Sequence, residues 1–479
     1  MAPDTSESDT SEPDTSEPKN SSSSKTPELP GRLAGLSVWR QVLVLAIWPL
    51  MEQLLGFLVG FVDTAIAGRL SVQATESIAV AAYIGWLMVL MYGAVGIGAA
   101  ALVSRAIGAR QRRLANKALG HAIVFGLVVG LFLTAFLLLT ADLISASMNL
   151  SDDSIQMAAT YLRVLAIAAP ASGVLFVSNA CLRASGDTKT PFRILAVVNL
   201  INVACSLLFV FASAPLGGYG VHGIAAGTVI AWCVGSILAV RALRSGNSPL
   251  RLGWGRLRPE PKTMRRILRI STPQFLDSLT MWTGNFLIAS IVGYIGRTSE
   301  PGALGAHVIV IRIEAISYLP GWALAVAAAT LTGQYLGLGD VQRAKQATSY
   351  CLLIAAITMG SMGLIFMLVP YQLVRLITSE PELLKMAPQL LRICGPAQVF
   401  LGTAMVFDQS LRGAGDTRMA TLIVAGSTIF IRLPAAYIVG VVYDQGVAGI
   451  WVAICSEITF RAIVSTAYYK SGRWTRVQV

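Results

Sequence analysis

The sequence is poor in charged residues and in the side chains that build metal or redox sites. Only 13% of its 479 residues are charged, against about 25% in soluble domains. Its three histidines are scattered, and its six cysteines form no Cys-x-x-Cys pair, so we expect no metal site and no redox motif. A phosphate-binding loop ending in Lys-Ser/Thr is also absent, which argues against ATP as an energy source. We therefore expect no cofactor.

Apolar residues, by contrast, are abundant. They make up 54% of the chain, and the mean hydropathy is +0.65. This composition excludes an ordinary soluble enzyme, a disordered protein and a nucleic-acid-binding protein, although the net charge is +12. A membrane explains the basic excess, because Lys and Arg accumulate in cytoplasmic loops.

Twelve apolar runs are long enough to cross a bilayer, which takes about 20 helical residues. They do not alternate apolar and polar residues as strands of an outer-membrane barrel do. The sequence thus predicts an all-α integral membrane protein with spans at 41–66, 79–104, 118–141, 157–181, 191–212, 222–243, 270–296, 303–333, 347–370, 387–411, 419–442 and 448–469.

The N-terminal segment 1–33 differs from the rest of the chain. It repeats a DTSE unit and holds seven carboxylates against two lysines, a composition typical of disorder. The predicted organisation is therefore an acidic tail (1–33), a six-helix lobe (34–244), a cytoplasmic linker (245–264), a second six-helix lobe (265–470) and a short C-terminal tail (471–479).

Basic residues gather in alternate loops. The connections after the second, fourth and sixth spans are rich in Arg and Lys, whereas 142–156, 213–221 and 443–447 contain none. The positive-inside rule then places both termini in the cytoplasm. We expect a multi-pass protein of the inner membrane, in contact with the lipid bilayer.

The two halves repeat each other. LRASGDTKTP begins at Leu182 and LRGAGDTRMA begins at Leu411, and the offset between these two positions also aligns Gly108 with Gly337. Each half holds six predicted spans, so the halves share one orientation and should be related by an axis along the membrane normal. Two such bundles that rock about a central site are typical of secondary transporters.

Several segments resemble bacterial members of the multidrug and toxic compound extrusion (MATE) family. They are GFVDTAIAGRLS, VSRAIGAR, LRASGDTKTPF and GAHVIVIRIEAISYLPGWALAVAAATLTGQYLGLGD, and the resemblance covers about residues 40–465. It implies two six-helix lobes around a V-shaped central cleft. It also implies export of organic cations in exchange for H⁺ or Na⁺.

Ionisable residues inside membrane spans are candidates for function. The first half has two carboxylates, Glu52 and Asp63, and no basic residue within a span. An unpaired carboxylate in a desolvated site takes up H⁺ or Na⁺ more readily than a paired one, so we place ion coupling in this half. Glu52 and Asp63 lie about three helical turns apart on a similar face. Pro49 can bend their helix and act as a hinge. Alternatively, it is a packing residue that the helix tolerates.

The resemblance assigns further roles. Asp63 lies in the VDT motif that holds the family's cation-site aspartate, and Asn202 matches the asparagine that faces it. Asn202 could equally make a structural hydrogen bond between helices. Some relatives have a second carboxylate where this chain has Ser206, and others have a glutamate where it has Met281. The choice between H⁺ and Na⁺ therefore stays open.

The second half contains acids and arginines together. We expect a structural network of Asp277, Arg312, Glu314, Arg432 and Glu457, with Arg461 also in a span, whereas Asp408 resembles a cleft carboxylate that meets cationic substrate. Candidates for the cleft wall are Gln53, Trp86, Tyr92, Trp282 and Tyr318, although such aromatic residues often pack or form an interfacial belt.

The leading functional hypothesis is a cation-coupled exporter of small organic cations that acts as a monomer. A flippase for a lipid-linked precursor would need a cleft rich in Arg or Lys. The predicted spans instead contain six carboxylates and only three arginines, and this balance favours cationic cargo. A membrane enzyme or receptor would need a catalytic constellation that the sequence does not contain.

Overall fold

The computed structural model describes residues 28–30, 33–147, 151–213, 217–246, 248–253, 255 and 257–477, which are helical apart from short connections. In this part of the chain, twelve helical segments are long and apolar enough to cross a membrane, as predicted. The acidic repeat before residue 28 lies outside the described residues. The first half contains α1 (Val38–Leu70), α2 (Val72–Gly108), α3 (Arg112–Ala146), α4 (Asp152–Ala184), α5 (Lys189–Phe211) and α6 (Gly220–Ser245).

The second half repeats this order with one irregular span. It contains α7 (Pro261–Thr298), α8 (Ala303–Leu338), α9 (Val341–Leu368), the short α10 (Pro370–Arg375), α11 (Pro381–Gly413), α12 (Thr417–Ser427), α13 (Leu433–Tyr437) and α14 (Gly446–Lys470). The eleventh span runs through α12 and α13 and includes two π-helical turns, at Thr428–Arg432 and Ile438–Val442. Pro434 follows the first of these turns, and a proline inside a helix removes one backbone hydrogen bond.

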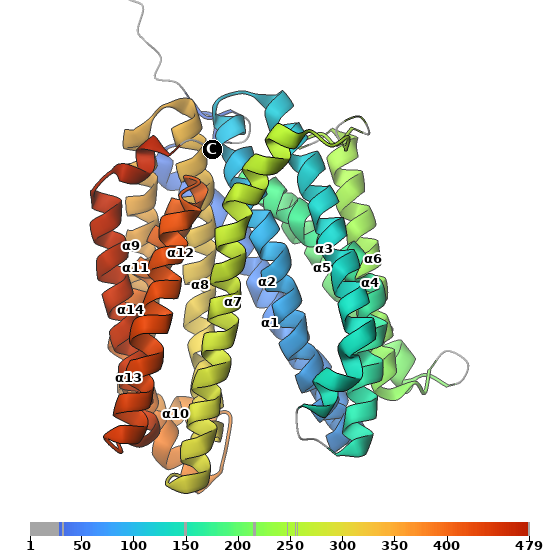
Figure 1. Cartoon of the computed structure of the whole chain (residues 1–479), viewed down its shortest axis with the longest axis vertical. Helices are drawn as coiled ribbons and strands as arrows, with labels where there is room; N and C mark the ends of the chain where they lie inside the picture. The colour runs from blue at the N-terminus through green and yellow to red at the C-terminus, as the bar shows by residue number, and fades with distance from the viewer. Residues whose placement is uncertain are drawn as a thin grey trace, which may run out of the picture.

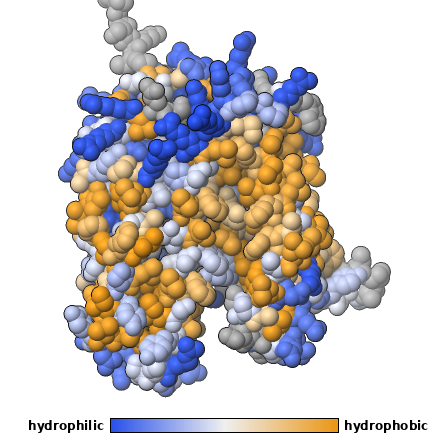
Figure 2. Space-filling view, in the orientation of Figure 1, coloured by the Kyte–Doolittle hydropathy of each residue, from blue (hydrophilic) through white to orange (hydrophobic). Residues whose placement is uncertain are grey.

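The two halves form separate bundles that converge at one end (Figure 1). The chain's C-terminus lies at this end, and Figure 2 shows hydrophilic residues gathered there above a broad apolar belt. We call it the basic end, because the Arg- and Lys-rich connections lie there. At the opposite end a notch separates the two bundles (Figure 2). The molecule therefore has the two-lobed shape expected from the repeat.

Repeated residues meet where the lobes touch. A methyl group on Gly108 of α2 would overlap the backbone of Gln334 in α8, and one on Gly337 would overlap the backbone of Arg105. The repeat that aligns the two glycines also aligns Arg105 with Gln334. Because glycine has no Cβ, it allows the backbones of α2 and α8 to come into direct contact.

The expected structureless tail ends earlier than residue 33. Leu29 and Leu33 are 2% and 1% exposed and belong to an apolar cluster with residues of α1, α8 and α9. The side chain of Gln41 in α1 donates a hydrogen bond to the Leu33 carbonyl at 3.2 Å. The prediction missed this segment because two leucines four residues apart are too few to form an apolar run.

The connection between the lobes is tied to the first one. The Arg251 amide donates to Asn116 Oδ1 at 2.7 Å, and Lys117 pairs with Glu260 at 3.0 Å. The Lys117 ammonium holds the pKa of the Glu260 carboxyl below its usual range. Helix α7 already starts at Pro261, inside the stretch 245–264 that we had expected to be linker.

Candidate functional site

Asp63 lies in α1, about two turns before the C-terminal end of this helix at Leu70. This end of α1 lies at the notched end of the molecule (Figure 1). Its Oδ1 atom is buried and has no hydrogen-bond donor among the described residues. Tyr161 of α4 lies close enough to interact electrostatically with it. No salt bridge to Asp63 is found in the described part of the chain. Asp63 thus has no ionic partner in the described ranges, and its role in ion coupling stays a prediction.

Asn202 extends this site across α5 and α6. Its Nδ2 donates to Thr228 Oγ1 at 2.9 Å, and Thr228 also interacts with the hydroxyl of Tyr161. We call Asp63, Tyr161, Thr228 and Asn202 the first-lobe polar cluster, since Tyr161 lies near both Asp63 and Thr228. Sequence reasoning missed Tyr161 and Thr228, although polar side chains inside apolar runs are a usable signal.

The cluster has unused oxygen atoms. Among the described residues, Asp63 Oδ1 and Asn202 Oδ1 are buried without a hydrogen-bond partner, as is the Oγ atom of Ser206, one turn along α5 from Asn202. Carbonyl, hydroxyl and carboxylate oxygens suit a proton or a hard cation. The cluster has only one carboxylate, and in the described residues no group of three His, Cys, Asp or Glu is placed to hold a metal ion.

Glu52 does not join this cluster. Arg183 from the last turn of α4 pairs with it at 2.7 Å, and the two side chains are 13% and 20% exposed. The expectation that both carboxylates of the first half are unpaired and available for ion coupling is therefore wrong for Glu52. The sequence hid this pair because Arg183 lies just outside the apolar core of its span.

The second lobe contains the counterpart of this pair. Arg412 of α11 donates to Asp277 of α7 at 2.8 Å, and both side chains are nearly buried. Arg412 and Arg183 occupy equivalent positions in the two LRxxGDT motifs, and each acid lies about one helical turn after the proline of its own helix. The ion pair is therefore part of the duplicated architecture, in the region where the lobes approach each other.

The remaining charges of the second lobe form a compact network around Glu457. Its side chain is fully buried and accepts hydrogen bonds from Arg432 at 2.9 and 2.5 Å and from Ser427 at 2.5 Å. Arg461 lies 3.9 Å away, one turn along α14. Glu314 accepts a hydrogen bond from Gln398 at 3.0 Å.

Arg312 does not take part in this network, contrary to our expectation. Its side chain is exposed on α8, and no carboxylate in the described part of the chain pairs with it. Arg412 takes its place beside Asp277. Asp408 also differs from the expected open-cleft carboxylate, because it is only 6% exposed and accepts a hydrogen bond from Ser465 at 2.7 Å.

The aromatic candidates divide into two groups. Tyr92 is 1% exposed and donates to the Ala169 carbonyl at 2.7 Å, so it packs between α2 and α4 and is not a cleft residue. Trp282 of α7 lies 4.7 Å from the ring of Tyr83 in α2, and Trp86 and Phe286 extend the group. We call these four rings the interlobe aromatic group. Gln53 is half-buried, and Tyr318 stacks on Trp322.

Twelve candidate membrane spans among the described residues, arranged in two repeated lobes, are typical of a secondary transporter. A protein-family model described as MatE matches residues 49–208 and 273–438, more than half of the chain. The chain therefore belongs to the MATE family of multi-pass membrane transporters.

Similar proteins agree with this assignment. The "Probable multidrug resistance protein NorM" of Thermotoga maritima is 27% identical over 91% of this chain and 93% of its own length. The "Probable multidrug resistance protein YoeA" of Bacillus subtilis is 23% identical over 95% and 98%.

Solved structures share the fold. One described as the "Outward-facing conformation of a multidrug resistance MATE family transporter of the MOP superfamily" has a TM-score of 0.84 at 21% identity and covers 91% of this chain and 96% of its own. A MOP superfamily transporter from Pyrococcus furiosus, described as having a binding pocket of reverse polarity, has a TM-score of 0.85 at 20% identity and covers 92% and 98%.

Proposed function

We propose that the protein is a secondary antiporter that exports lipophilic organic cations in exchange for H⁺ or Na⁺. The two lobes alternate between openings at the notched end and at the basic end. The basic end faces the cytoplasm in the inner membrane, with both termini there, and one chain suffices for transport. The observation that carries this proposal is the unpaired Asp63 in the first-lobe polar cluster.

Ion coupling is assigned to that cluster. Asp63 supplies one negative charge, and Tyr161 lies near both Asp63 and Thr228. Thr228 in turn accepts a hydrogen bond from Asn202. The Asp63 carboxylate can take up the proton or bind Na⁺, and Asn202 Oδ1, which has no hydrogen-bond partner among the described residues, can accept a hydrogen bond or coordinate the cation. Pro49 interrupts the backbone hydrogen bonds of α1, so binding at Asp63 can alter the bend of this helix and thereby the separation of the lobes.

Substrate binding is assigned to the interlobe aromatic group. Its rings come from α2 of one lobe and α7 of the other, so a molecule held between them contacts both moving parts. Aromatic faces attract organic cations, and the attraction grows when water is excluded. The Tyr83 hydroxyl and the Trp282 indole nitrogen have no hydrogen-bond partner among the described residues, so both can donate to acceptor groups of a substrate.

A flippase of a lipid-linked precursor is the second candidate. Arg312, exposed on α8 and without a carboxylate partner in the described residues, is the kind of group that anionic cargo requires. It stands alone, whereas the other span arginines of this lobe are paired, so cationic cargo remains the better supported reading.

Efflux of ethidium from proteoliposomes tests the proposal. We expect efflux under an imposed proton or Na⁺ gradient, no driven efflux for Asp63→Asn at equal protein level, and normal efflux for Asp153→Asn, whose carboxylate is exposed. Driven efflux by Asp63→Asn at the wild-type rate would contradict the coupling site. Counterflow of anionic lipid precursor without ethidium transport would instead support the flippase.

A further inference from the structure

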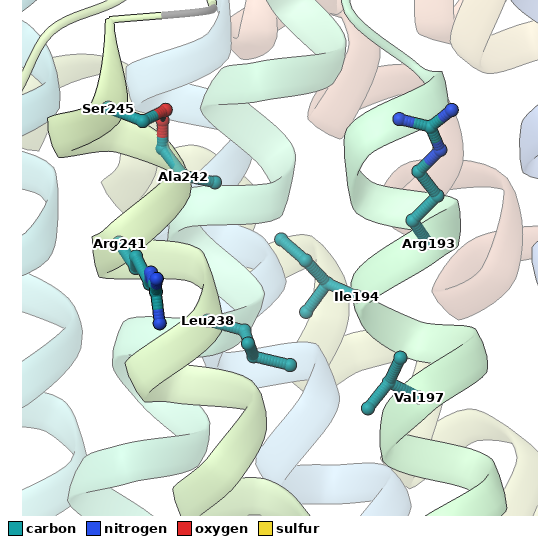
Figure 3. A pocket seen from close by; sticks show the side chains of 7 residues that line it. All are labelled: Arg193, Ile194, Val197, Leu238, Arg241, Ala242 and Ser245. Carbon is teal, nitrogen blue, oxygen red and sulfur yellow. Dashed lines mark hydrogen bonds between the residues drawn. The ribbon is translucent and has the colours of Figure 1, made fainter.

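A groove runs along the surface of the first lobe between α5 and α6, at the basic end. It has a volume of about 320 Å³, and its apolar floor is made by Ile194, Val197 and Leu238. Figure 3 shows these three side chains between the helices, with Arg193 on α5 and Arg241 on α6 at either side. We call it the α5–α6 groove.

Both arginines are available for a ligand. Their side chains are exposed, and no carboxylate in the described ranges forms a salt bridge with either. Arg193 lies in the second turn of α5 and Arg241 in the second-last turn of α6, which puts both near the level where the apolar spans end. Guanidinium groups at this level are suited to lipid phosphates, which they bind through paired hydrogen bonds.

The second lobe shows that the fold does not require this arrangement. The alignment of Leu182 with Leu411 also aligns Arg193 with Leu422. The alignment of GYGVHGI with DQGVAGI likewise pairs Arg241 with Ala467. Both arginines are therefore replaced by apolar residues on the equivalent helices. The basic pair is specific to the first lobe, and packing of the duplicated bundle does not explain it.

We propose that the α5–α6 groove binds an anionic glycerophospholipid from the leaflet at the basic end. Its phosphate lies between Arg193 and Arg241, and an acyl chain follows Ile194, Val197 and Leu238. The apolar floor distinguishes this occupant from a free phosphate, which would use the arginines alone. Such a lipid would bridge α5 and α6, which hold Asn202 and Thr228 deeper in the membrane.

Native mass spectrometry of the purified full-length chain tests the proposal, with dioleoyl phosphatidylglycerol, dioleoyl phosphatidylcholine and glycerol 3-phosphate as probes. The test variant is Arg193→Gln/Arg241→Gln. The matched control is Arg418→Gln/Lys470→Gln, which removes two exposed basic residues from the same end of α12 and α14. Arg193→Lys/Arg241→Lys keeps the charge and should keep most of the binding.

We expect wild type and the control to retain phosphatidylglycerol in preference to phosphatidylcholine, and the Gln variant to bind it roughly tenfold more weakly. Equal retention by the Gln variant, or an equal loss in the control, would overturn the site. Binding of glycerol 3-phosphate as tight as that of the lipid would overturn the assigned role of the apolar floor and with it the lipid proposal. These results do not depend on ethidium transport, so the proposed function can fail while the lipid site stands.

Discussion

Removal of the Arg412 side chain tests whether the buried ion pair between Arg412 and Asp277 stabilises the fold. Arg412→Met would leave the Asp277 carboxylate, 5% exposed, without the cation that now lies 2.8 Å away. Its remaining hydrogen bond comes from the neutral amide of Gln274 at 3.3 Å. Removing one member of a buried ion pair costs about 3–5 kcal/mol, because the other charge stays desolvated. We therefore expect a marked fall in the thermal unfolding midpoint.

Buried cysteines of the chain can report its unfolding, and two further variants serve as controls. Cys181, Cys351 and Cys394 are buried, so a thiol-reactive dye follows unfolding in detergent at one fixed heating rate. Replacement of the exposed Arg312 by Met should shift stability by no more than about 0.5 kcal/mol, and Arg412→Met/Asp277→Leu should recover most of the loss. The reasoning is refuted if Arg412→Met melts like wild type, or if Arg312→Met melts lower than Arg412→Met.

Three further outcomes are expected. Glu52→Gln should lower the same unfolding midpoint by less than Arg412→Met does, because the guanidinium that it leaves unpaired is 20% exposed; a larger fall would contradict the burial argument. Gly108→Leu should abolish ethidium efflux at normal protein level, because its side chain would force α2 and α8 apart, whereas Gly56→Ala, which has open space around it, should transport normally. Deletion of 1–27 should leave the midpoint unchanged and deletion of 1–33 should lower it, since burying each leucine contributes about 1.5–3 kcal/mol; equal midpoints would show that the buried leucines do not matter.

The spans and the duplication were predictable because they rest on signals that tertiary packing does not alter. A run of about 20 apolar residues has few alternatives to a membrane helix, and two copies of LRxxGDT, one in each half of the chain, indicate a repeat whatever the packing. Asp63 could also be singled out from the sequence, because a carboxylate inside such an apolar run is rare and costly unless it has a function.

Side-chain partners were less predictable. Arg183 and Arg412 lie at the ends of apolar runs and resemble loop residues, yet α4 and α11 extend past those runs and their arginines reach back to acids on α1 and α7. Arg312 lies deep in an apolar run, where pairing seemed required, but it is on the exposed face of α8. Helices that are apolar on all sides show no periodicity that separates a packed face from a cleft face, which also explains the error at Tyr92.

The contact between α2 and α8 bears on how the chain arose. Gly108 meets Gln334, and Gly337 meets Arg105. Because Gly337 is the counterpart of Gly108 and Gln334 is the counterpart of Arg105, the same two positions make the contact in both directions. This is the isologous pattern of a two-fold dimer, in which one patch recognises a second copy of itself. An ancestral six-helix protein with this patch could have paired before its gene was duplicated and fused. The fusion would then have inherited a working interface, and each half became free to specialise, one keeping Asp63 unpaired and the other surrounding Glu457 with arginines.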